Sequence, residues 1–336
     1  MISVCIPTYN GAEFLLQTLD SASAQTFDDF EILIVDDGST DSTVEIAERF
    51  AQRERRARIV RNAARAGSSA RNANRCVEEA RGEWIKFLFQ DDLMAPDCLA
   101  KMLAAGRRGR LVIAWHDYLF SGDVAADVRQ FYETLPTLGA VLPSDFVAPD
   151  AFCSAVMEHL GVNFIGPTSS SFIHRNCFAT YGPFSREIVS YPDLEFWMRV
   201  GSNVGLSIVR EPLVSFRVHG GSVSGRMRGN AAQARRQRLE WLHLLWLIAH
   251  TAEYATLRDV ALSWTPPLDA ARLLVGETID LRWEALEESH RRRDRARLTE
   301  FNAFCDRHPE IGAIVRDHDA ALPVWTRLKQ FMKARI

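Results

Sequence analysis

Residues 84–92 read Trp-Ile-Lys-Phe-Leu-Phe-Gln-Asp-Asp, an apolar run that ends in two adjacent carboxylates. The run has the length and aromatic content of a strand covered on both faces, as in parallel sheets. Such sheets bind ligands at the carboxyl ends of their strands. We therefore expect a buried strand that brings Asp91 and Asp92 to one sheet edge. There a divalent metal against a phosphate-bearing substrate would offset the repulsion between the two carboxylates.

The sequence before this run alternates between strand and helix patterns. Strands are predicted at 2–6, 30–35 and 58–61, and each is followed by turn residues and an amphipathic segment. The first helix is expected at 13–24, the second after a cap at Ser39 or Thr40, and the third after Ser69. Three such units that lead into a fourth strand predict an α/β sheet with right-handed crossovers.

The pattern loosens after Pro96. We expect a helix near 97–106, a strand at 111–115 and a section at 121–149 with little periodicity, which would shape a specificity surface. Order returns with a polar turn and strand at 163–173 and a helical segment that starts near Tyr191. Two final strands are predicted at 207–210 and 214–218.

From residue 231 onward the composition shifts to Leu, Ala, Trp, Arg and Glu, which predicts three or four helices with breaks at Pro266-Pro267 and Pro309. Residues 239–249 are apolar nearly all round, so this helix either packs against the α/β domain or faces a membrane. The basic run at 290–297 fits a solvated helix with i,i+4 ion pairs, or docking to an anionic membrane.

Overall composition narrows the class of protein. A net charge of −3 over 336 residues argues against a nucleic-acid binder. The six cysteines are scattered with no C-x-x-C pair, which argues against a zinc knot or a disulfide framework and favours reduced thiols in the cytoplasm. The first residues lack the features of a signal peptide, and no window reaches about 18 consecutive apolar residues.

Carboxylates or an imidazole follow four of the predicted strands or turns: Asp36-Asp37, Asp91-Asp92, Asp193 with Glu195, and His219. A single Asp at a strand end commonly satisfies the amides of a turn. Two Asp-Asp pairs at one edge favour a functional site, because adjacent carboxylates are costly without a ligand.

An ordered series of motifs resembles family 2 glycosyltransferases of the GT-A fold. The motifs are V-C-I-P-T-Y-N-G at 4–11, I-L-I-V-D-D-G-S-T-D at 32–41, A-R-N at 70–72, F-Q-D-D at 89–92, the segment 191–197 and F-R-V-H-G-G-S-V-S at 216–224. The resemblance covers about the first 225 residues. It implies a Rossmann-like mixed sheet flanked by helices, with a nucleotide-sugar-binding half (1–110), an acceptor-binding half (111–228) and a C-terminal helical extension (229–336).

The resemblance implies a nucleotide site at the first strand ends. Tyr9 would stack on the base, with Pro7 and Thr8 beside it, and Asp37 would accept from a uracil-type N–H. Arg71 would lie near the base or the diphosphate, although an exposed helix Arg is an equal alternative.

The same resemblance places Asp91 at the ribose and Asp92 on Mn²⁺ or Mg²⁺, with His219 completing the metal shell or contacting the diphosphate. A histidine satisfied by its own loop is the alternative for His219. Phe89 departs from the D-x-D pattern, which has an acid there. In the loop after His219, Ser222 and Ser224 would close over the donor, and Arg226 and Arg228 would meet phosphate oxygens.

Asp193 matches the family's catalytic base at the start of the acceptor-side helix, where Pro192 replaces a Glu and suits the first helical turn. A carboxylate at a helix N-terminus should stay ionised. Glu195 is the alternative base, and Trp197 is expected in the core or as a sugar platform.

The implied reaction is an inverting, metal-dependent transfer from a nucleotide-diphosphate sugar, with UDP the first choice, to a hydroxyl of a glycan, polysaccharide or lipid-linked acceptor in bacterial surface polysaccharide synthesis. The implied location is the cytoplasm, with peripheral contact at the inner face of the plasma membrane through the C-terminal helices. A non-catalytic nucleotide-sugar-binding subunit of an assembly complex is the alternative.

Overall fold

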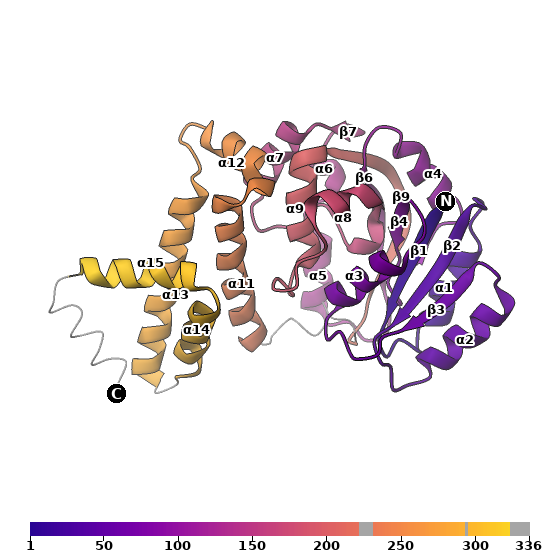
Figure 1. Cartoon of the computed structure of the whole chain (residues 1–336), viewed down its shortest axis with the longest axis horizontal. Helices are drawn as coiled ribbons and strands as arrows, with labels where there is room; N and C mark the ends of the chain where they lie inside the picture. The colour runs from indigo at the N-terminus through magenta and orange to yellow at the C-terminus, as the bar shows by residue number, and fades with distance from the viewer. Residues whose placement is uncertain (222–230, 293–294, 323–336) are drawn as a thin grey trace. The chain divides into compact units, whose positions relative to one another are not determined.

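The computed structural model describes residues 1–221, 231–292 and 295–322 (Figure 1). The chain divides into two compact units, Met1–Gly229 and Asn230–Ile336. Ser222, Ser224, Arg226 and Arg228, for which we predicted a role in closing over the donor, lie outside the described residues.

A nine-stranded mixed sheet forms the centre of the first unit, in the order β3-β2-β1-β4-β8-β6-β9-β5, with β7 paired to β9. Strands β1 to β4 are parallel, and β8 runs antiparallel to both β4 and β6. The predicted α/β class is therefore confirmed. The strands are β1 (Ile2–Thr8), β2 (Phe30–Asp36), β3 (Ala57–Arg61), β4 (Trp84–Phe87), β5 (Leu93–Met94), β6 (Leu111–Phe120), β7 (Phe146–Val147), β8 (Ser171–His174) and β9 (Leu206–Val218).

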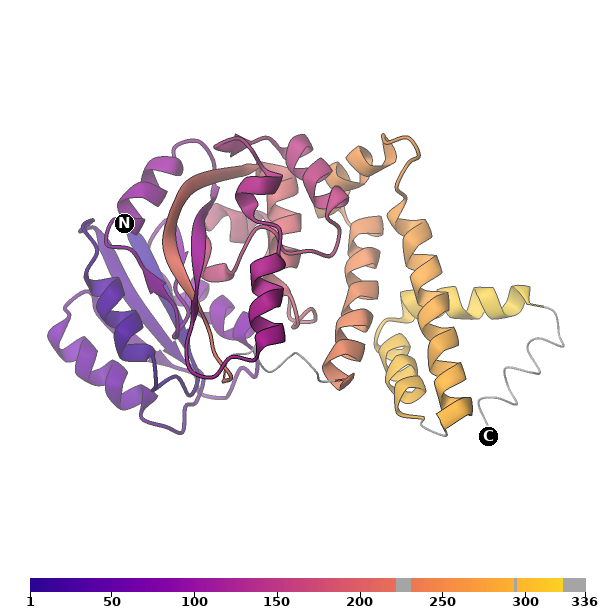
Figure 2. The same cartoon turned by 180° about the vertical axis from the view of Figure 1, so that it is seen from behind.

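Helices cover both faces of this sheet (Figures 1 and 2). They are α1 (Leu15–Ser23), α2 (Thr43–Arg53), α3 (Ser69–Glu79), α4 (Cys98–Ala105), α5 (Ala126–Thr134), α6 (Leu138–Val141), α7 (Pro149–Glu158), α8 (Arg175–Tyr181) and α9 (Pro192–Val204), with a 3-10 turn, η1, at Thr168–Ser170.

Strand β1 is buried on both of its faces, which explains why helices cover both faces of the sheet. Successive side chains of a strand point to opposite faces, and every residue of β1 is buried. Val4 and Ile6 pack with apolar residues of α1, α2 and α4 in one core cluster. Cys5 points the other way, with its Sγ 3.9 Å from the carbonyl of Cys76 in α3. Burial on both faces is the pattern expected of a parallel sheet.

The strand predicted at 84–89 is shorter than expected. The Leu88 N–H still donates to the Cys5 carbonyl at 3.0 Å, but Phe89 N–H turns away and donates to Ser169 Oγ at 2.9 Å. The strand therefore ends at Phe87, and the two aspartates lie on a turn beyond it rather than on its last residues.

The two strands predicted at 207–210 and 214–218 are one continuous strand, β9. Val209 pairs with Ala114, Pro212 with Trp115 and Val214 with His116, so three residues of β9 in this stretch are left without a partner on β6. This bulge accommodates Pro212, which has no N–H to donate to the sheet. Figure 2 shows β6 and β9 side by side as two long curved strands.

Residues 121–149, whose periodicity is weak, contain α5, α6 and β7. One further prediction about the first unit was wrong, because helix α2 has its cap residue at Ser42 rather than at Ser39 or Thr40. Ser39 is used elsewhere, because its Oγ accepts from Asn10 N–H at 2.9 Å and donates to Asp36.

The second unit is helical, as predicted. Its described residues contain five α-helices rather than three or four: α11 (Ala231–His250), α12 (Ala255–Leu262), α13 (Ala270–Arg292), α14 (Ala296–Arg307) and α15 (Pro309–Ala321), with a 3-10 turn, η2, at Ala252–Tyr254. Leu242 and Leu245 of the apolar stretch 239–249 are buried in a core shared with α13, α14 and α15. Pro309 starts α15 at a position where its missing N–H costs nothing.

The basic run of the second unit is paired with acids. Arg291 contacts Glu287 at 2.5 Å, and Arg297 contacts both Glu284 and Glu288 at 2.9 Å. Of these pairs, Arg291–Glu287 has the i,i+4 spacing that we predicted as one alternative, whereas the pairs of Arg297 join α14 to α13 instead of lying on one helix. Within the described ranges, no helix combines the length and the apolar character that crossing a bilayer requires.

Candidate functional site

Asp92 is a buried carboxylate held by three neighbouring segments. Its side chain is 1% exposed, and its two oxygens accept from Ser169 Oγ and, at 2.8 Å, from Arg217 N–H. Burial raises the pKa of Asp92 well above its usual range, and the nearby charge of Asp91 adds to the effect. Asp92 therefore ties the turn after β4 to η1 and to β9.

Lys86 lies beneath this turn, although lysine is rarely fully buried. Its ammonium donates to the Phe87 carbonyl at 2.8 Å and to the Ser169 carbonyl, and the side chain is 0% exposed. Burial lowers the pKa of Lys86, and the charge of Asp92 opposes that effect. Ser169 Oγ donates to Asp92, and Lys86 donates to the Ser169 carbonyl. Lys86 therefore helps to position the Asp92 carboxylate through Ser169.

Asp91 contacts the predicted histidine. Its Oδ2 lies 3.1 Å from Nε2 of His219, and both side chains are partly exposed. The Arg217 guanidinium fixes the same turn by donating to the Asp91 carbonyl at 2.7 Å, and it lies 4.4 Å from the centre of the Phe14 ring. The Phe14 ring also meets the His219 ring edge-on, at 4.7 Å between centres.

We predicted that Asp92 and His219 share the ion, and this stays a prediction. In the structure His219 contacts Asp91, and both oxygens of Asp92 accept protein hydrogen bonds. In an octahedral shell with ligands at about 2.1 Å, adjacent ligand atoms lie about 3 Å apart. The 3.1 Å between Asp91 Oδ2 and His219 Nε2 fits two such ligands of a hard cation.

Asp193 lies in the first turn of α9. Pro192 occupies the first helical position, as predicted, and needs no N–H partner there. The Asp193 carboxylate accepts from Leu194 N–H at 2.8 Å and from Asn163 Nδ2 at 3.3 Å. Asn163 is held in turn by two hydrogen bonds with Gly166, at 3.2 and 3.1 Å.

Burial raises the pKa of Asp193 from 3.8 to about 6, while its hydrogen bonds from Leu194 and Asn163 act in the opposite direction. Burial therefore outweighs the helix N-terminus in its effect on the pKa. At pH 7 the group is nevertheless mostly ionised, as we expected, and it is a stronger base than an ordinary aspartate. A base with a pKa near the working pH suits proton removal from a hydroxyl.

Glu195, the alternative base, is used in an ion pair. It is 2% exposed, and its two oxygens accept from Arg199 Nε at 2.6 Å and Nη2 at 3.0 Å. Arg199 also donates to the carbonyls of the segment 181–183. Trp197 is fully buried and donates from Nε1 to the Gly166 carbonyl at 3.2 Å, so it is a core residue.

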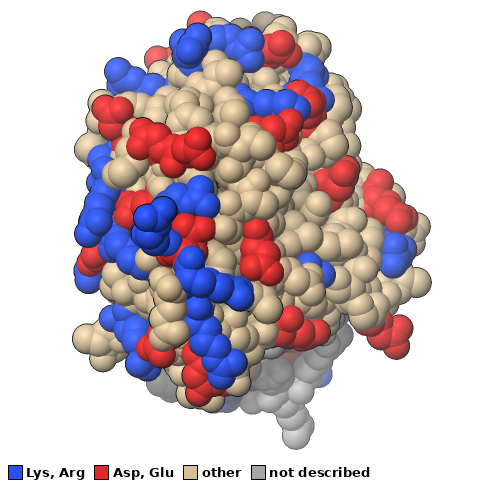
Figure 3. Space-filling model, turned by 90° about the vertical axis from the view of Figure 1, so that its right-hand side faces the viewer, with Lys and Arg blue, Asp and Glu red and all other residues tan. Residues whose placement is uncertain are grey.

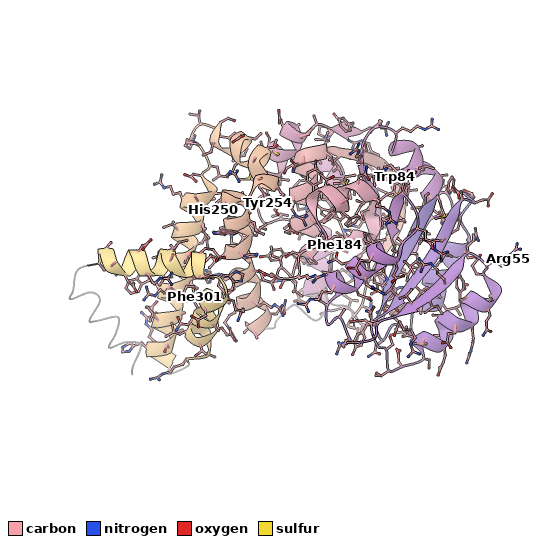
Figure 4. All side chains as sticks on the ribbon, in the orientation of Figure 1. Arg55, Trp84, Phe184, His250, Tyr254 and Phe301 are labelled. Atoms are coloured by element: carbon pink, nitrogen blue, oxygen red, sulfur yellow. The ribbon has the colours of Figure 1, made fainter. Side chains whose placement is uncertain are left out.

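A cavity of about 210 Å³ brings the carboxylates together, because Asp91, Asp92 and Asp193 all line it. Its other walls include Phe89, Ser169, Pro192 and Phe184. Phe184, labelled in Figure 4, comes from the segment between α8 and α9 and packs 4.5 Å from the Phe196 ring. We call this the reaction cavity. Three carboxylates from two distant parts of the chain thus face one space, as expected from the sequence.

Several predicted site residues lie outside the lining of the reaction cavity. Tyr9 is held by Gln90, whose amide accepts from Tyr9 N–H at 2.8 Å and donates to the Tyr9 carbonyl at 3.1 Å. The Arg65 guanidinium lies 4.0 Å from the centre of the Tyr9 ring. A planar cation therefore covers the ring that we predicted to stack on a base.

Asp36 and Asp37 are satisfied by protein donors. Asp36 accepts from the N–H groups of Gly38 and Ser39 at 3.0 Å, which is the turn alternative noted above. Asp37 accepts from Asn62 Nδ2 at 2.9 Å and from the N–H groups of Ala66 and Gly67. Protein hydrogen bonds therefore compensate both charges in this structure, and the ligand-binding role of the pair stays a prediction. A base N–H would be a fourth donor to Asp37.

The remaining predicted residues belong to the same corner of the sheet. Pro7 and Thr8 are buried in β1, and Asn72 Nδ2 donates to the carbonyls of Thr8 and Val35, at 3.2 and 3.0 Å. Arg71 is exposed on α3, and its side chain makes no hydrogen bond or ion pair within the described ranges. Its charge is therefore available to an anionic ligand.

Sequence reasoning missed four supporting residues: Lys86, Gln90, Asn163 and Arg217. Lys86 was the one recognisable signal, because a lysine inside an otherwise apolar strand must have a buried partner. Gln90, Asn163 and Arg217 act through contacts with residues far away in the sequence, which local pattern does not disclose.

The face of the molecule in Figure 3 carries Lys and Arg interspersed with Asp and Glu.

Comparison with known proteins supports the resemblance. The family "Glycosyl transferase family 2" matches residues 3–155. A "PGL/p-HBAD biosynthesis glycosyltransferase" of Mycobacterium bovis (strain BCG) is 42% identical over 215 residues, which is 61% of this chain and 72% of the relative. Seven other bacterial relatives are matched over 24% to 82% of their own length.

Two solved structures share the fold. A fragment (1–349) of TarS from S. aureus in complex with UDP-GlcNAc gives a TM-score of 0.58 at 16% identity, over 83% of this chain and 80% of that one. The mannosyltransferase PcManGT from Pyrobaculum calidifontis, in complex with GDP-Man and Mn²⁺, gives 0.54 at 19% identity, over 99% and 84%. The predicted GT-A fold is thus confirmed. Together with the identity to the mycobacterial relative, these matches show that the chain belongs to glycosyltransferase family 2.

Proposed function

We propose that this protein transfers a sugar from a nucleoside-diphosphate sugar to an acceptor hydroxyl with inversion at the anomeric carbon, and that Asp193 is the catalytic base. One observation carries the proposal. A carboxylate with its pKa raised to about 6 shares a cavity with Asp91 and Asp92, which follow the central strand β4. A base and a donor-binding edge that face one space are what direct displacement requires.

The donor would lie along the ends of β1, β2 and β4. Tyr9 and Asp37 would contact the base, with Pro7 and Thr8 alongside, and the exposed Arg71 would meet the diphosphate. Asp91 and His219 would hold Mn²⁺ or Mg²⁺, with Asp92 supporting the turn from below. When bound, such an ion supplies positive charge that stabilises the departing diphosphate.

In the proposed step, the Asp193 carboxylate takes the proton of the acceptor hydroxyl as that oxygen attacks the anomeric carbon. The bond from carbon to the diphosphate oxygen breaks on the opposite side, and its electron pair leaves with the nucleoside diphosphate. Asn163 keeps Asp193 oriented through the 3.3 Å hydrogen bond. One displacement with no covalent enzyme intermediate inverts the anomeric configuration.

The neighbours guide the choice of donor and acceptor. The TarS fragment was solved with UDP-GlcNAc, and PcManGT was solved with GDP-Man and Mn²⁺. We take UDP as the first nucleotide to test. A glycan or lipid-linked acceptor in bacterial surface polysaccharide synthesis is our working choice.

A donor panel tests the proposal. Thermal unfolding with UDP-, GDP-, dTDP- and CMP-linked ligands, each with and without Mn²⁺, should single out one nucleotide, because bound ligand raises the unfolding temperature by mass action. Proton NMR of the product sugar should then show the opposite anomeric configuration to the donor. Retention of configuration, or neither transfer nor hydrolysis with any donor that binds, would refute the proposal and favour a non-catalytic binding subunit.

We also propose that the protein works in the cytoplasm at the inner face of the plasma membrane, where a lipid-linked acceptor would lie. Flotation with liposomes that contain anionic lipid, at low and moderate salt, tests this. The ion pairs of Arg291 and Arg297 lower the basic charge that is free for lipid. We therefore expect salt-sensitive, weak binding at most.

A further inference from the structure

A second cavity, of about 480 Å³, lies in the first unit and is separate in its lining from the reaction cavity. Its size falls in the range of about 300–1,000 Å³ that is typical of small-molecule sites. The segment 163–167 lies between the two: Asn163 and Gly166 line the second cavity, whereas Pro167 lines the reaction cavity. The two spaces are therefore neighbours across a short loop.

Aromatic faces and neutral polar groups make up the chemistry of the second cavity. Trp115, Tyr118 and Phe164 contribute rings. The Trp115 Nε1–H is buried and has no hydrogen-bond partner among the described residues. Burial lowers the pKa of His116 to about 4, so its imidazole is neutral at pH 7 and offers a donor and an acceptor.

This chemistry excludes two classes of occupant. A phosphate or nucleotide would find no Lys or Arg among the described lining residues, and it would meet the Asp117 carboxylate. A fully apolar chain would leave the buried Trp115 N–H unsatisfied, which costs about 1–3 kcal/mol. A sugar ring fits both requirements, because it has an apolar face for the aromatic rings and hydroxyls for the polar groups.

We propose that the second cavity is a saccharide subsite that holds a sugar ring of the acceptor next to Asp193. The inference rests on the transfer function proposed above. Asn163 connects the two spaces, since it lines the second cavity and donates to Asp193 Oδ2 at 3.3 Å. An acceptor with a ring in this subsite would thus lie next to Asp193, across the segment 163–167 from the reaction cavity.

Ligand-observed NMR on the full chain tests binding without relying on activity. The probes are methyl glycosides of glucose, galactose, mannose and N-acetylglucosamine, together with maltose and cellobiose, in the presence of saturating UDP. At least one probe should bind, and His116→Phe and Trp115→Phe should each weaken it by about five- to tenfold through loss of a hydrogen bond. His250→Phe, in the second unit, is the matched control and should bind as the wild type does. Binding of no probe, or equal binding by the variants, would overturn the proposal.

Two further readings separate the possible failures. Wild-type hydrolysis of a nucleotide sugar without acceptor reports the proposed function alone. A probe that binds should also gain one glycosyl unit, detected by mass spectrometry, when the active donor is supplied. If the donor is hydrolysed but the bound saccharide never gains a glycosyl unit, the second cavity does not bind the acceptor. That result would refute the proposal that it is an acceptor subsite.

Discussion

Replacing Asp193 by Asn should make the protein more stable at pH 8 while it removes the base. Burial raises the pKa of Asp193 from 3.8 to about 6, so the folded state disfavours the charged form. The difference corresponds to about 3 kcal/mol. This stability is fully present below pH 3.8 and is lost as the pH rises through about 6, because the folded state binds the proton more tightly than the unfolded state.

The Asn side chain resembles the protonated carboxyl group of Asp193 and does not ionise. The variant therefore does not lose this stability as the pH rises. It keeps an oxygen for Leu194 N–H, but its NH₂ group cannot accept from Asn163 Nδ2. The lost hydrogen bond costs about 1 kcal/mol. We therefore expect Asp193→Asn to raise the free energy of unfolding by about 2 kcal/mol at pH 8 and to lower it by about 1 kcal/mol near pH 3.5.

Urea unfolding of both proteins at the two pH values measures this crossing. Asp123→Asn is the matched control, since Asp123 is exposed in the loop before α5 and should change stability little at either pH. A variant that is less stable than the wild type at pH 8, or a difference that does not depend on pH, would refute the argument that Asp193 is held in a site that disfavours its charge.

Four further predictions follow from the site. The rate of transfer should fall below a midpoint near pH 6 as Asp193 becomes protonated, and a flat profile between pH 5 and 8 would exclude it as the base. Gln90→Leu, which frees the Tyr9 backbone, should raise the donor KM about tenfold, as expected for the loss of two hydrogen bonds, with kcat little changed; a change in kcat alone would contradict a donor-side role. Lys86→Met should lower the free energy of unfolding by about 3 kcal/mol, since two carbonyls lose a charged donor, and an unchanged urea midpoint would show that this ammonium supports nothing. His219→Ala should abolish the effect of added Mn²⁺ on UDP affinity measured by calorimetry, whereas an undiminished metal effect would remove His219 from the ion site.

Much of the fold could be predicted because its signals are local. The apolar runs of β1, β2 and β4 and the turns after them predict a parallel sheet without knowledge of any contact. Pro192 was predicted at the start of a helix because its preference depends only on its own backbone. The two strands predicted at 207–210 and 214–218 proved to be one, because a bulge in the long pair β6–β9 absorbs Pro212 between them.

The site could be predicted only as far as residue types at strand ends allow. Asp91 and Asp92 are indistinguishable in sequence, and their difference arises from long-range partners: His219 for Asp91, Ser169 and Arg217 N–H for Asp92. Asp193 and Glu195 differ because Arg199, four residues further along the same helix, takes the carboxylate of Glu195. That i,i+4 pair is a local pattern, whereas the partners of Asp91 and Asp92 depend on the folded chain.

The central claim is that Asp193 removes the acceptor proton while a separate edge binds the donor. Asp193→Asn should bind the preferred nucleotide with unchanged Kd in calorimetry and lose about 10²–10⁴-fold in transfer rate, the range typical of a general base. Glu195→Gln, whose change lies in the buried ion pair, should lower stability and retain the rate per folded molecule. Wild-type transfer by Asp193→Asn, or a loss of nucleotide binding that accounts for its inactivity, would contradict the claim.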